Sequence, residues 1–240
     1  MHNHYYGWGL PFNASAHGAA IDRLIYMIHG FMALLFAGWL LYLMIALIRF
    51  RQRPGRQAIY QIRHSKTANY LEVGVALFEI LLLFGFSFPI FNHYRNLLPP
   101  KDQALEVRVV AEQFAWNIHY PGADGIFGRT SRSLINPSNP VGLDRSDPAA
   151  ADDRTVVNQL HVPVHKPVIV RLSSKDVIHS FFLPVMRVKQ DVIPGQVIPV
   201  WFEAVETGKF EIGCAQLCGL GHYRMRGFFW WTPRKIFRSG

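Results

Sequence analysis

Two long apolar runs near the start of the chain restrict its fold more than any other feature. The first, 24–48, holds twenty-five residues without a formal charge, and the second, 70–91, holds twenty-two residues that include Glu72 and Glu79. At about 1.5 Å per residue, a helix of either length crosses a hydrocarbon core roughly 30 Å thick. The first run is too long for a cleaved signal peptide and has no basic segment before it. The sequence therefore predicts a two-helix transmembrane hairpin within residues 1–98.

The segment between the two runs is basic and contains no acid. Its positive residues are Arg49, Arg51, Arg53, Arg56, Arg63 and Lys66. Short loops rich in Lys and Arg stay on the cytoplasmic side of a membrane. We therefore expect a bacterial plasma-membrane protein with two spans and with both termini on the periplasmic side. The same segment supplies much of the formal net charge of +9, so that charge does not indicate a nucleic-acid partner.

Glu72 and Glu79 lie inside the second apolar run. A charged side chain at the bilayer centre costs about 2.5–3.5 kcal/mol on insertion scales, so such residues usually face protein or water. Glu79 is compatible with a proton path or with a neutral acid bonded to a neighbouring subunit. Under either reading, we expect the hairpin to pack against another membrane protein.

Residues 99–240 have the composition of a domain exposed to water. Positions 101–240 carry thirteen acids and seventeen Lys or Arg, a net charge of +4. Short alternating or β-branched runs, separated by Pro, Gly and Asp, predict an all-β sandwich or Greek-key barrel. The stretch 121–154 is rich in Gly, Pro, Ser, Asn and Asp and is long for a connection. It is either an insertion that contacts a partner or a partly mobile segment.

One segment of this domain concentrates metal-binding side chains. Cys214, Cys218, His222 and Met225 follow the spacing C-x3-C-x3-H-x2-M within twelve residues, and the two cysteines are the only ones in the chain. Thiolate, imidazole and thioether together favour copper, because Cys and Met bind Cu(I) and His binds either oxidation state.

Four interpretations of this spacing remain: a Cys214–Cys218 disulfide, a zinc site, a mononuclear copper site with one surplus cysteine, and two copper ions bridged by thiolates. The dinuclear site requires a second histidine from elsewhere. His179 is the best candidate, because it follows the strand-like run VIVRL and lies in DVIHSFFLP. The other histidines of the domain that we considered have no motif around them and are expected to be structural or at the surface: His119, His161 and His165.

Taken together, these segments resemble subunit II of cytochrome c oxidase, the subunit of haem–copper oxidases that carries the dinuclear CuA centre. The resemblance rests on the two-helix hairpin, on DVIHSFFLP with the following MRVKQDVIPG, and on CAQLCGLGHYRM. It covers most of the chain. It implies a cupredoxin-like Greek-key barrel for residues 99–240, following the transmembrane hairpin.

The resemblance also implies a ligand set and a function. The implied ligands of the two copper ions are His179, Cys214, the backbone carbonyl of Gln216, Cys218, His222 and Met225. The cysteines would bridge the ions; His179 and Met225 would complete one, and His222 with Gln216 the other. The chain would be the electron-accepting subunit of a terminal oxidase, taking single electrons from a cytochrome c and passing them to haem in subunit I, where oxygen is reduced to water. A CuA-containing nitric oxide reductase is the alternative. A copper-free quinol oxidase subunit would lack the ligands present here.

Three positions depart from the family pattern. Gln216 stands where many members have Glu, whose side chain helps to bind magnesium or manganese at the subunit interface, so this second metal is left open. Phe114 replaces the tryptophan at which electrons are thought to enter, whereas Trp116 is retained; core packing is the other interpretation of both aromatics. Glu72 resembles the acid at the mouth of a proton channel, but the Trp-Thr that usually follows is missing.

The charge of the domain bears on its electron donor. A net charge of +4 does not favour a strongly basic soluble cytochrome c. We therefore expect a dedicated, membrane-anchored or complex-bound cytochrome c, in addition to subunit I and other oxidase subunits.

Overall fold

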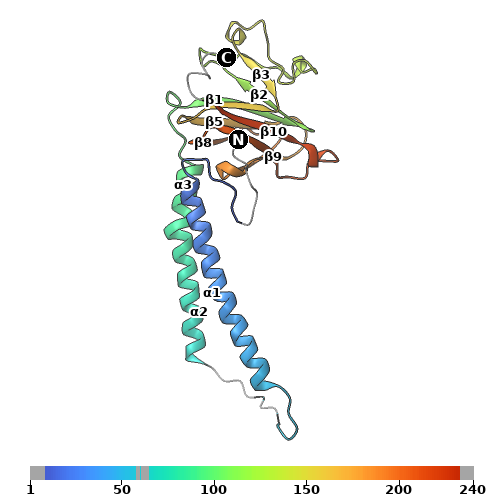
Figure 1. Cartoon of the computed structure of the whole chain (residues 1–240). Coiled ribbons are helices and arrows are strands. Elements are labelled where there is room, and N and C mark those ends of the chain that lie inside the picture. The colour runs from blue at the N-terminus through green and yellow to red at the C-terminus, as the bar shows by residue number, and fades with distance from the viewer. Residues whose placement is uncertain (1–8, 58–59, 61–64, 233–240) are drawn as a thin grey trace. The chain divides into compact units, whose positions relative to one another are not determined.

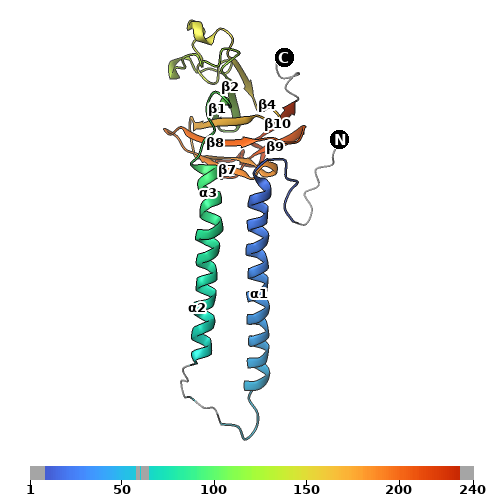
Figure 2. The same cartoon turned by 90° about the vertical axis from the view of Figure 1, so that its left-hand side faces the viewer.

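The N-terminal part of the chain forms a helical hairpin (Figure 1). Its elements are α1 (Gly18–Phe50), α2 (Lys66–Leu81), the π-helical η1 (Leu82–Ser87) and α3 (Phe88–Arg95). Figure 2 shows α1 and α2 running along each other in opposite directions, and the Phe31 and Phe78 rings meet at 4.3 Å between centroids. Two helical stretches, Gly18–Phe50 and Lys66–Arg95, are long and apolar enough to cross a membrane.

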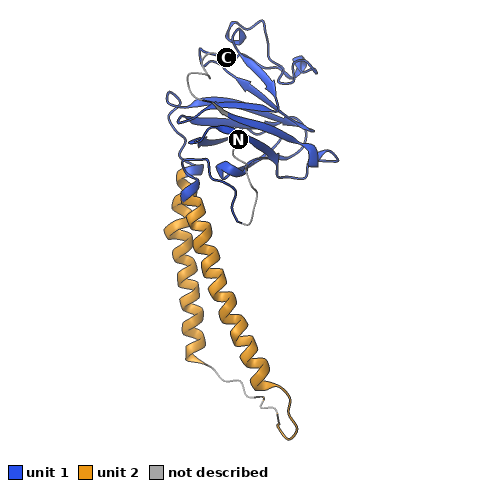
Figure 3. Cartoon of the chain, in the orientation of Figure 1, with its two compact units in different colours: residues 1–19, 94–240 blue, residues 20–93 orange. Residues whose placement is uncertain are grey.

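The computed structural model describes residues 9–57, 60 and 65–232. Arg63 of the basic segment and the two chain ends, 1–8 and 233–240, lie outside the described residues. By internal contacts the chain divides into two units, 20–93 and 1–19 with 94–240 (Figure 3).

Both long helices begin before the apolar runs from which they were predicted. The Ser15 hydroxyl accepts the amide N–H of Gly18 at 2.9 Å, and the Ser65 hydroxyl accepts that of Ala68 at 3.3 Å. Serine oxygens satisfy amide groups that have no partner in the first helical turn. Ser65 is thus the N-cap of α2, and Ser15 closes the turn that leads into α1, whereas the apolar runs mark the part suited to the bilayer.

The rest of the chain is built from two five-stranded sheets. The strands are β1 (Leu105–Glu112), β2 (Ala115–Tyr120), β3 (Arg154–Val157), β4 (Gln159–Pro163), β5 (Pro167–Ser174), β6 (His179–Leu183), β7 (Val188–Val192), β8 (Ile198–Glu203), β9 (Gly208–Cys214) and β10 (Arg226–Thr232). One sheet has the order β3-β2-β1-β5-β8 and the other β4-β10-β9-β6-β7. The pairs β1–β5 and β4–β10 are parallel, and the remaining neighbours are antiparallel. The chain thus crosses between the sheets several times.

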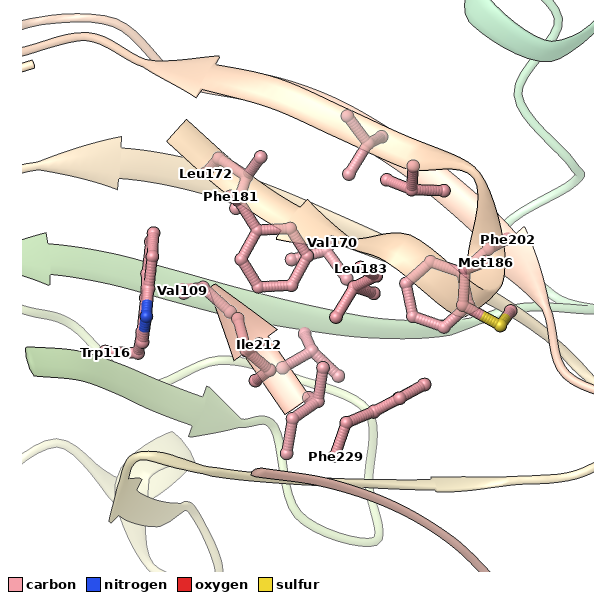
Figure 4. Packing of buried hydrophobic residues seen from close by; sticks show 14 of the residues in the cluster. Val109, Trp116, Val170, Leu172, Phe181, Leu183, Met186, Phe202, Ile212 and Phe229 are labelled. Carbon is pink, nitrogen blue, oxygen red and sulfur yellow. The ribbon is translucent and has the colours of Figure 1, made fainter. Parts of the chain in front are cut away.

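The core lies among the inward-facing side chains of these strands. Along β1, Val107, Val109 and Ala111 are buried at every second position, as the two-residue period of a strand requires. Figure 4 shows Val109 of β1 packed among Phe181, Ile212 and other core residues from both sheets. The predicted architecture, a transmembrane hairpin followed by a cupredoxin-like β domain, is confirmed.

The stretch 121–154 is tied to the barrel by a buried polar pair. The Asp153 carboxylate accepts hydrogen bonds from His119 Nε2 at 2.6 Å and from the Gly128 amide at 2.8 Å. His119 and Asp153 are both almost completely buried. Arg145 also donates to the backbone carbonyl of Asp153, at 3.1 Å. Short helical turns η2 (Arg132–Leu134) and η3 (Pro148–Ala150) occupy the stretch between these contacts.

The buried His119–Asp153 pair should make the stability of the β domain depend on pH. Burial lowers the pKa of His119 and outweighs its hydrogen bond to Asp153, so the folded state resists protonation of this ring. The unfolded chain takes up the proton below about pH 6.5. The contribution of the neutral His119 ring to the free energy of unfolding is therefore fully present above that pH, and it falls as the pH drops toward the folded-state pKa. The loss is at most about 1.4 kcal/mol per pH unit. We expect His119→Gln to reduce the change in thermal midpoint between about pH 7 and about pH 5.5, whereas His165→Asn, in an exposed turn, leaves it unchanged.

Candidate metal centre

Strand pairing brings the predicted ligand segments together. His179 is the first residue of β6, and Cys214 is the last residue of β9. The two strands are antiparallel neighbours with Phe181 opposite Cys214, and the Ala215 amide donates to the Ser180 carbonyl at 3.0 Å. The end of one strand therefore lies beside the start of the other.

A His–Cys–Cys cluster forms at this point. The ligand atoms of His179, Cys214 and Cys218 all lie within 4.8 Å of one another. The two sulfur atoms are 3.8 Å apart, well beyond the roughly 2.05 Å of a disulfide bond, and both thiols are free.

The remaining predicted ligands lie around the same sulfur atoms. Cys218 Sγ is 3.6 Å from His222 Nδ1 and 3.7 Å from Met225 Sδ. The backbone carbonyl oxygen of Gln216 is 3.2 Å from Cys214 Sγ. The structure thus brings together all six groups that the sequence predicts as ligands.

The ligand loop is folded back on itself by its own backbone. The amides of His222, Arg224 and Met225 donate to the carbonyls of Gly219, Gly221 and His222, each at 3.1 Å. These bonds form the short helix η5 (His222–Arg224) between the second cysteine and Met225. Gly219 has a φ of +133°, which a residue with a side chain rarely adopts.

The Phe114 ring packs directly against this loop. A Cβ atom added at Gly221 would overlap the ring, and one added at Gly219 would lie 2.6 Å from Gln113 Nε2. The glycines therefore allow close approach between the ligand loop and the turn that joins β1 to β2.

The two thiols have different protonation behaviour. Burial raises the pKa of Cys214, but the neighbouring His179 and the backbone of Ser180 and Gln216 outweigh burial and lower this pKa to about 6. Burial, followed by the charge of Cys214, raises the pKa of Cys218 to about 11. For His179, burial lowers the pKa, yet the nearby Cys214 and Asp176 give a net upward shift.

The donor set fits a soft metal ion. His179 is fully buried, and Cys218 and Met225 expose 4% and 2% of their surface. The Nε2 atom of His179 donates to Asp176 Oδ1 at 2.9 Å, whereas the buried Nδ1 makes no hydrogen bond of good geometry. A buried nitrogen without a partner, next to two thiols and a thioether, suits copper better than a metal that prefers oxygen ligands.

Two aromatic residues predicted at the site lie next to it. Trp116 is fully buried, with its ring edge-on to His179 at 6.2 Å and to Phe181 at 5.5 Å between centroids. Phe114 is half-buried over the ligand loop. Trp116 thus belongs to the core and to the surroundings of His179 at the same time.

Other sequence candidates lie elsewhere. Glu72 is on α2, in the other unit of the chain. His119 pairs with Asp153, His161 stacks on Trp230 with 3° between the ring planes, and His165 is in a turn. None of these histidines belongs to the cluster.

The sequence interpretation missed Asp176 and the side chain of Gln113. Asp176 holds His179 Nε2, and Gln113 Nε2 donates to the Cys218 carbonyl at 2.6 Å. An acid three residues before a ligand histidine is a usable signal, because such histidines commonly donate their second N–H to a carboxylate. Gln113 has no local signal.

Comparison with known proteins identifies the family. The sequence model described as "Cytochrome C oxidase subunit II, periplasmic domain" matches residues 105–227, just over half of the chain. The chain belongs to the cytochrome c oxidase subunit II family. It is 35% identical over 207 residues to the alternative cytochrome c oxidase subunit 2 of Bradyrhizobium diazoefficiens, covering 86% of this chain and 73% of that protein.

Two further relatives illustrate the similarity. Cytochrome c oxidase subunit 2 of Cereibacter sphaeroides is 27% identical over 237 residues, which is 90% of this chain and 74% of that one. The crystal structure of the periplasmic domain of subunit II of cytochrome oxidase from Bradyrhizobium japonicum is 30% identical, with 60% of this chain and 93% of that chain covered, at a TM-score of 0.43.

Membership of this family indicates the general function of the chain. The chain is a membrane-anchored subunit of cytochrome c oxidase, a haem–copper oxidase complex of several subunits, and the family implies copper binding. The relatives named here are oxidase subunits, so they do not favour the nitric oxide reductase alternative.

The contact between Phe114 and the ligand loop can be tested by measuring the free energy of unfolding of variants. We expect Gly221→Ala to reduce the free energy of unfolding by about 1–3 kcal/mol, because the new methyl group overlaps the ring. In a Phe114→Ala background the same change should reduce the free energy of unfolding much less. Chemical denaturation of the unsubstituted chain, the two single variants and the double variant measures this difference. Gly213→Ala is the matched control, because its added Cβ has Phe182 as its nearest neighbour, at 3.9 Å. An equal cost of Gly221→Ala in both backgrounds would contradict the contact.

Proposed function

We propose that this chain holds a dinuclear copper centre and is the electron-accepting subunit of a terminal oxidase. The observation that carries the proposal is the convergence on Cys218: a second thiol, an imidazole and a thioether lie within 3.8 Å of its sulfur. His179 adds a second imidazole whose Nδ1 is buried and without a hydrogen bond. A zinc site or a single copper would leave one of these donors unused.

The resemblance to subunit II implies the ligand assignment that we propose. Cys214 and Cys218 would be shared by the two copper ions. His179 and Met225 would complete one ligand set, and His222 with the Gln216 carbonyl the other. A copper pair held by these residues would supply one-electron redox chemistry. The chain would then accept electrons from a cytochrome c for delivery to haem in subunit I, where oxygen is reduced to water.

The protein residues supply fixed positions and a dry surrounding. Strand pairing holds the backbone at both residues: Cys214 lies opposite Phe181 of β6, and His179 lies opposite Val192 of β7. Trp116, Phe181 and Met225 are buried on the core side of the site and exclude water there. Restricted ligand movement favours electron transfer, because little rearrangement then accompanies a change of oxidation state.

The outer face of the ligand loop is suited to a docking partner. Leu217, Leu220 and Tyr223 expose 77%, 98% and 86% of their surface. We assign this apolar face to the cytochrome c donor, and Phe114 and Trp116 to the route by which electrons enter. The domain carries a net charge of +4, which favours a dedicated, membrane-anchored or complex-bound cytochrome over a strongly basic soluble one.

The proposal extends to the membrane part. The basic residues between the helices favour a cytoplasmic loop, which leaves the β domain (residues 99–240) and both termini on the periplasmic side. The hairpin (within 1–98) packs against subunit I, and Glu72 is assigned to the mouth of a proton path. With Gln216 in place of an acid, a magnesium or manganese ion at the interface would lack that carboxylate.

Copper content is the direct test of the site. The full chain purified in detergent and loaded with copper is expected to bind two copper ions with one electron spin shared between them in the EPR spectrum. Cys218→Ser should abolish this signal, because it removes the sulfur that the other donors surround. One copper, or zinc alone, bound by the unsubstituted chain would contradict the dinuclear centre.

The salt dependence of turnover tests the proposed docking face. In the intact oxidase with a soluble basic cytochrome c, we expect turnover to change by less than about threefold as salt rises, since the contact is mainly apolar. Leu220→Ser should weaken donor binding and leave the copper EPR signal unchanged. A steep loss of activity with rising salt would contradict an apolar docking face and indicate steering by charge.

A further inference from the structure

The turn between β1 and β2 connects the two segments that carry the proposed ligands. The backbone amide of Gln113 donates to Asp176 Oδ2 at 2.7 Å, and the Gln113 side-chain amide donates to the Cys218 carbonyl at 2.6 Å. Asp176 lies three residues before His179. A single residue thus joins the His179 segment to the loop that holds Cys218.

The other oxygen of Asp176 fixes the histidine ring. Asp176 Oδ1 accepts from the Val177 amide at 2.7 Å and from His179 Nε2 at 2.9 Å. A carboxylate accepts and does not donate, so Nε2 must carry the proton, and Nδ1 is left unprotonated in the neutral ring. The hydrogen bond therefore selects the tautomer whose Nδ1 is free for a metal and sets the orientation of the ring.

Neighbouring contacts hold this turn against the strand end. Lys175 donates through its backbone amide to the Ala111 carbonyl at 3.0 Å, and its ammonium group pairs with Glu112 at 2.7 Å. Together with the Gln113–Asp176 bond, these contacts join residues 111–113, at the end of β1, to residues 175–176, which follow β5. The carboxylate of Asp176 is thus placed by the sheet and not by its own segment alone.

We propose that Gln113 and Asp176 are positioning residues for the metal centre: their hydrogen bonds set the orientation of His179 and its distance from the Cys218 segment. The inference rests on the ligand set proposed above. Loss of either side chain would leave the ligands in the chain but remove a contact that sets the His179 ring and the Cys218 loop relative to each other. Partners of this kind commonly affect metal affinity by 10–100-fold.

The test compares variants of the full chain loaded with copper in detergent. Gln113→Ala and Asp176→Ala remove the two links. Gln113→Glu is matched in size but replaces the donating amide with a charged carboxylate that cannot donate to the Cys218 carbonyl. Asp176→Asn keeps an oxygen that can accept from His179 Nε2. Gln103→Ala and Asp191→Ala are the controls, because both side chains are exposed and lie outside the link.

We expect the Ala variants and Gln113→Glu to lose copper to a chelator on the order of 10–100 times more readily. At full loading, their EPR and visible spectra should differ from those of the unsubstituted chain, whereas Asp176→Asn should change less than Asp176→Ala. The two controls should match the unsubstituted chain.

Unchanged affinity and spectra in all four variants would overturn the inference. A lower thermal midpoint with unchanged spectra and copper affinity would also overturn it, because the contacts would then serve the fold alone. If the unsubstituted chain binds one copper instead of two, the dinuclear proposal fails, while the same comparison of affinity and spectra still decides the positioning role.

Discussion

The pairing of β6 with β9 is the constraint on which the candidate metal centre depends. It sets Phe181 opposite Cys214 and thereby places His179 beside a cysteine thirty-five residues further along the chain. Neither strand is free to shift, because β7 and β10 flank the pair and the Phe181 and Ile212 side chains are fully buried in the core. A one-residue slip would turn the inward side chains outward, so the packing of the two sheets also fixes the register at the site.

This dependence explains which parts of the molecule the sequence could predict. Apolar length predicted the hairpin, and short alternating runs predicted the β domain, because these features are local. The ligand candidates were also recognisable locally, as four side chains within twelve residues and a histidine after a strand. Residues far apart along the chain gave no such signal. The Gln113–Asp176 bond spans 63 positions and the Gln113–Cys218 bond 105, and neither leaves a pattern in its own segment.

A similar limit applies to the segment before α1. Nothing in its composition suggests a strand, yet the Ala14 amide donates to the Val185 carbonyl, and the Val205 amide donates to the Ala14 carbonyl. Ala14 is fully buried in the core of the β unit. Burial of such a short segment depends on the shape of the surface that receives it, and that surface exists only in the folded domain.

The ligand loop contains both buried and exposed residues. Cys218 is 4% exposed, whereas Leu220, two residues later, is 98% exposed. Cys218 lies outside the strands but is packed in the core, so contacts other than strand pairing hold it in place. These contacts include the backbone bonds of η5, the packing of Phe114 against the loop glycines and the hydrogen bond from Gln113 to the Cys218 carbonyl. His179 Nδ1 is buried beside Cys214 without a hydrogen bond of good geometry, and a bound metal would occupy this nitrogen. Metal binding and local order would therefore be linked, because an ion held by Nδ1 and by the loop donors would also join the loop to β6.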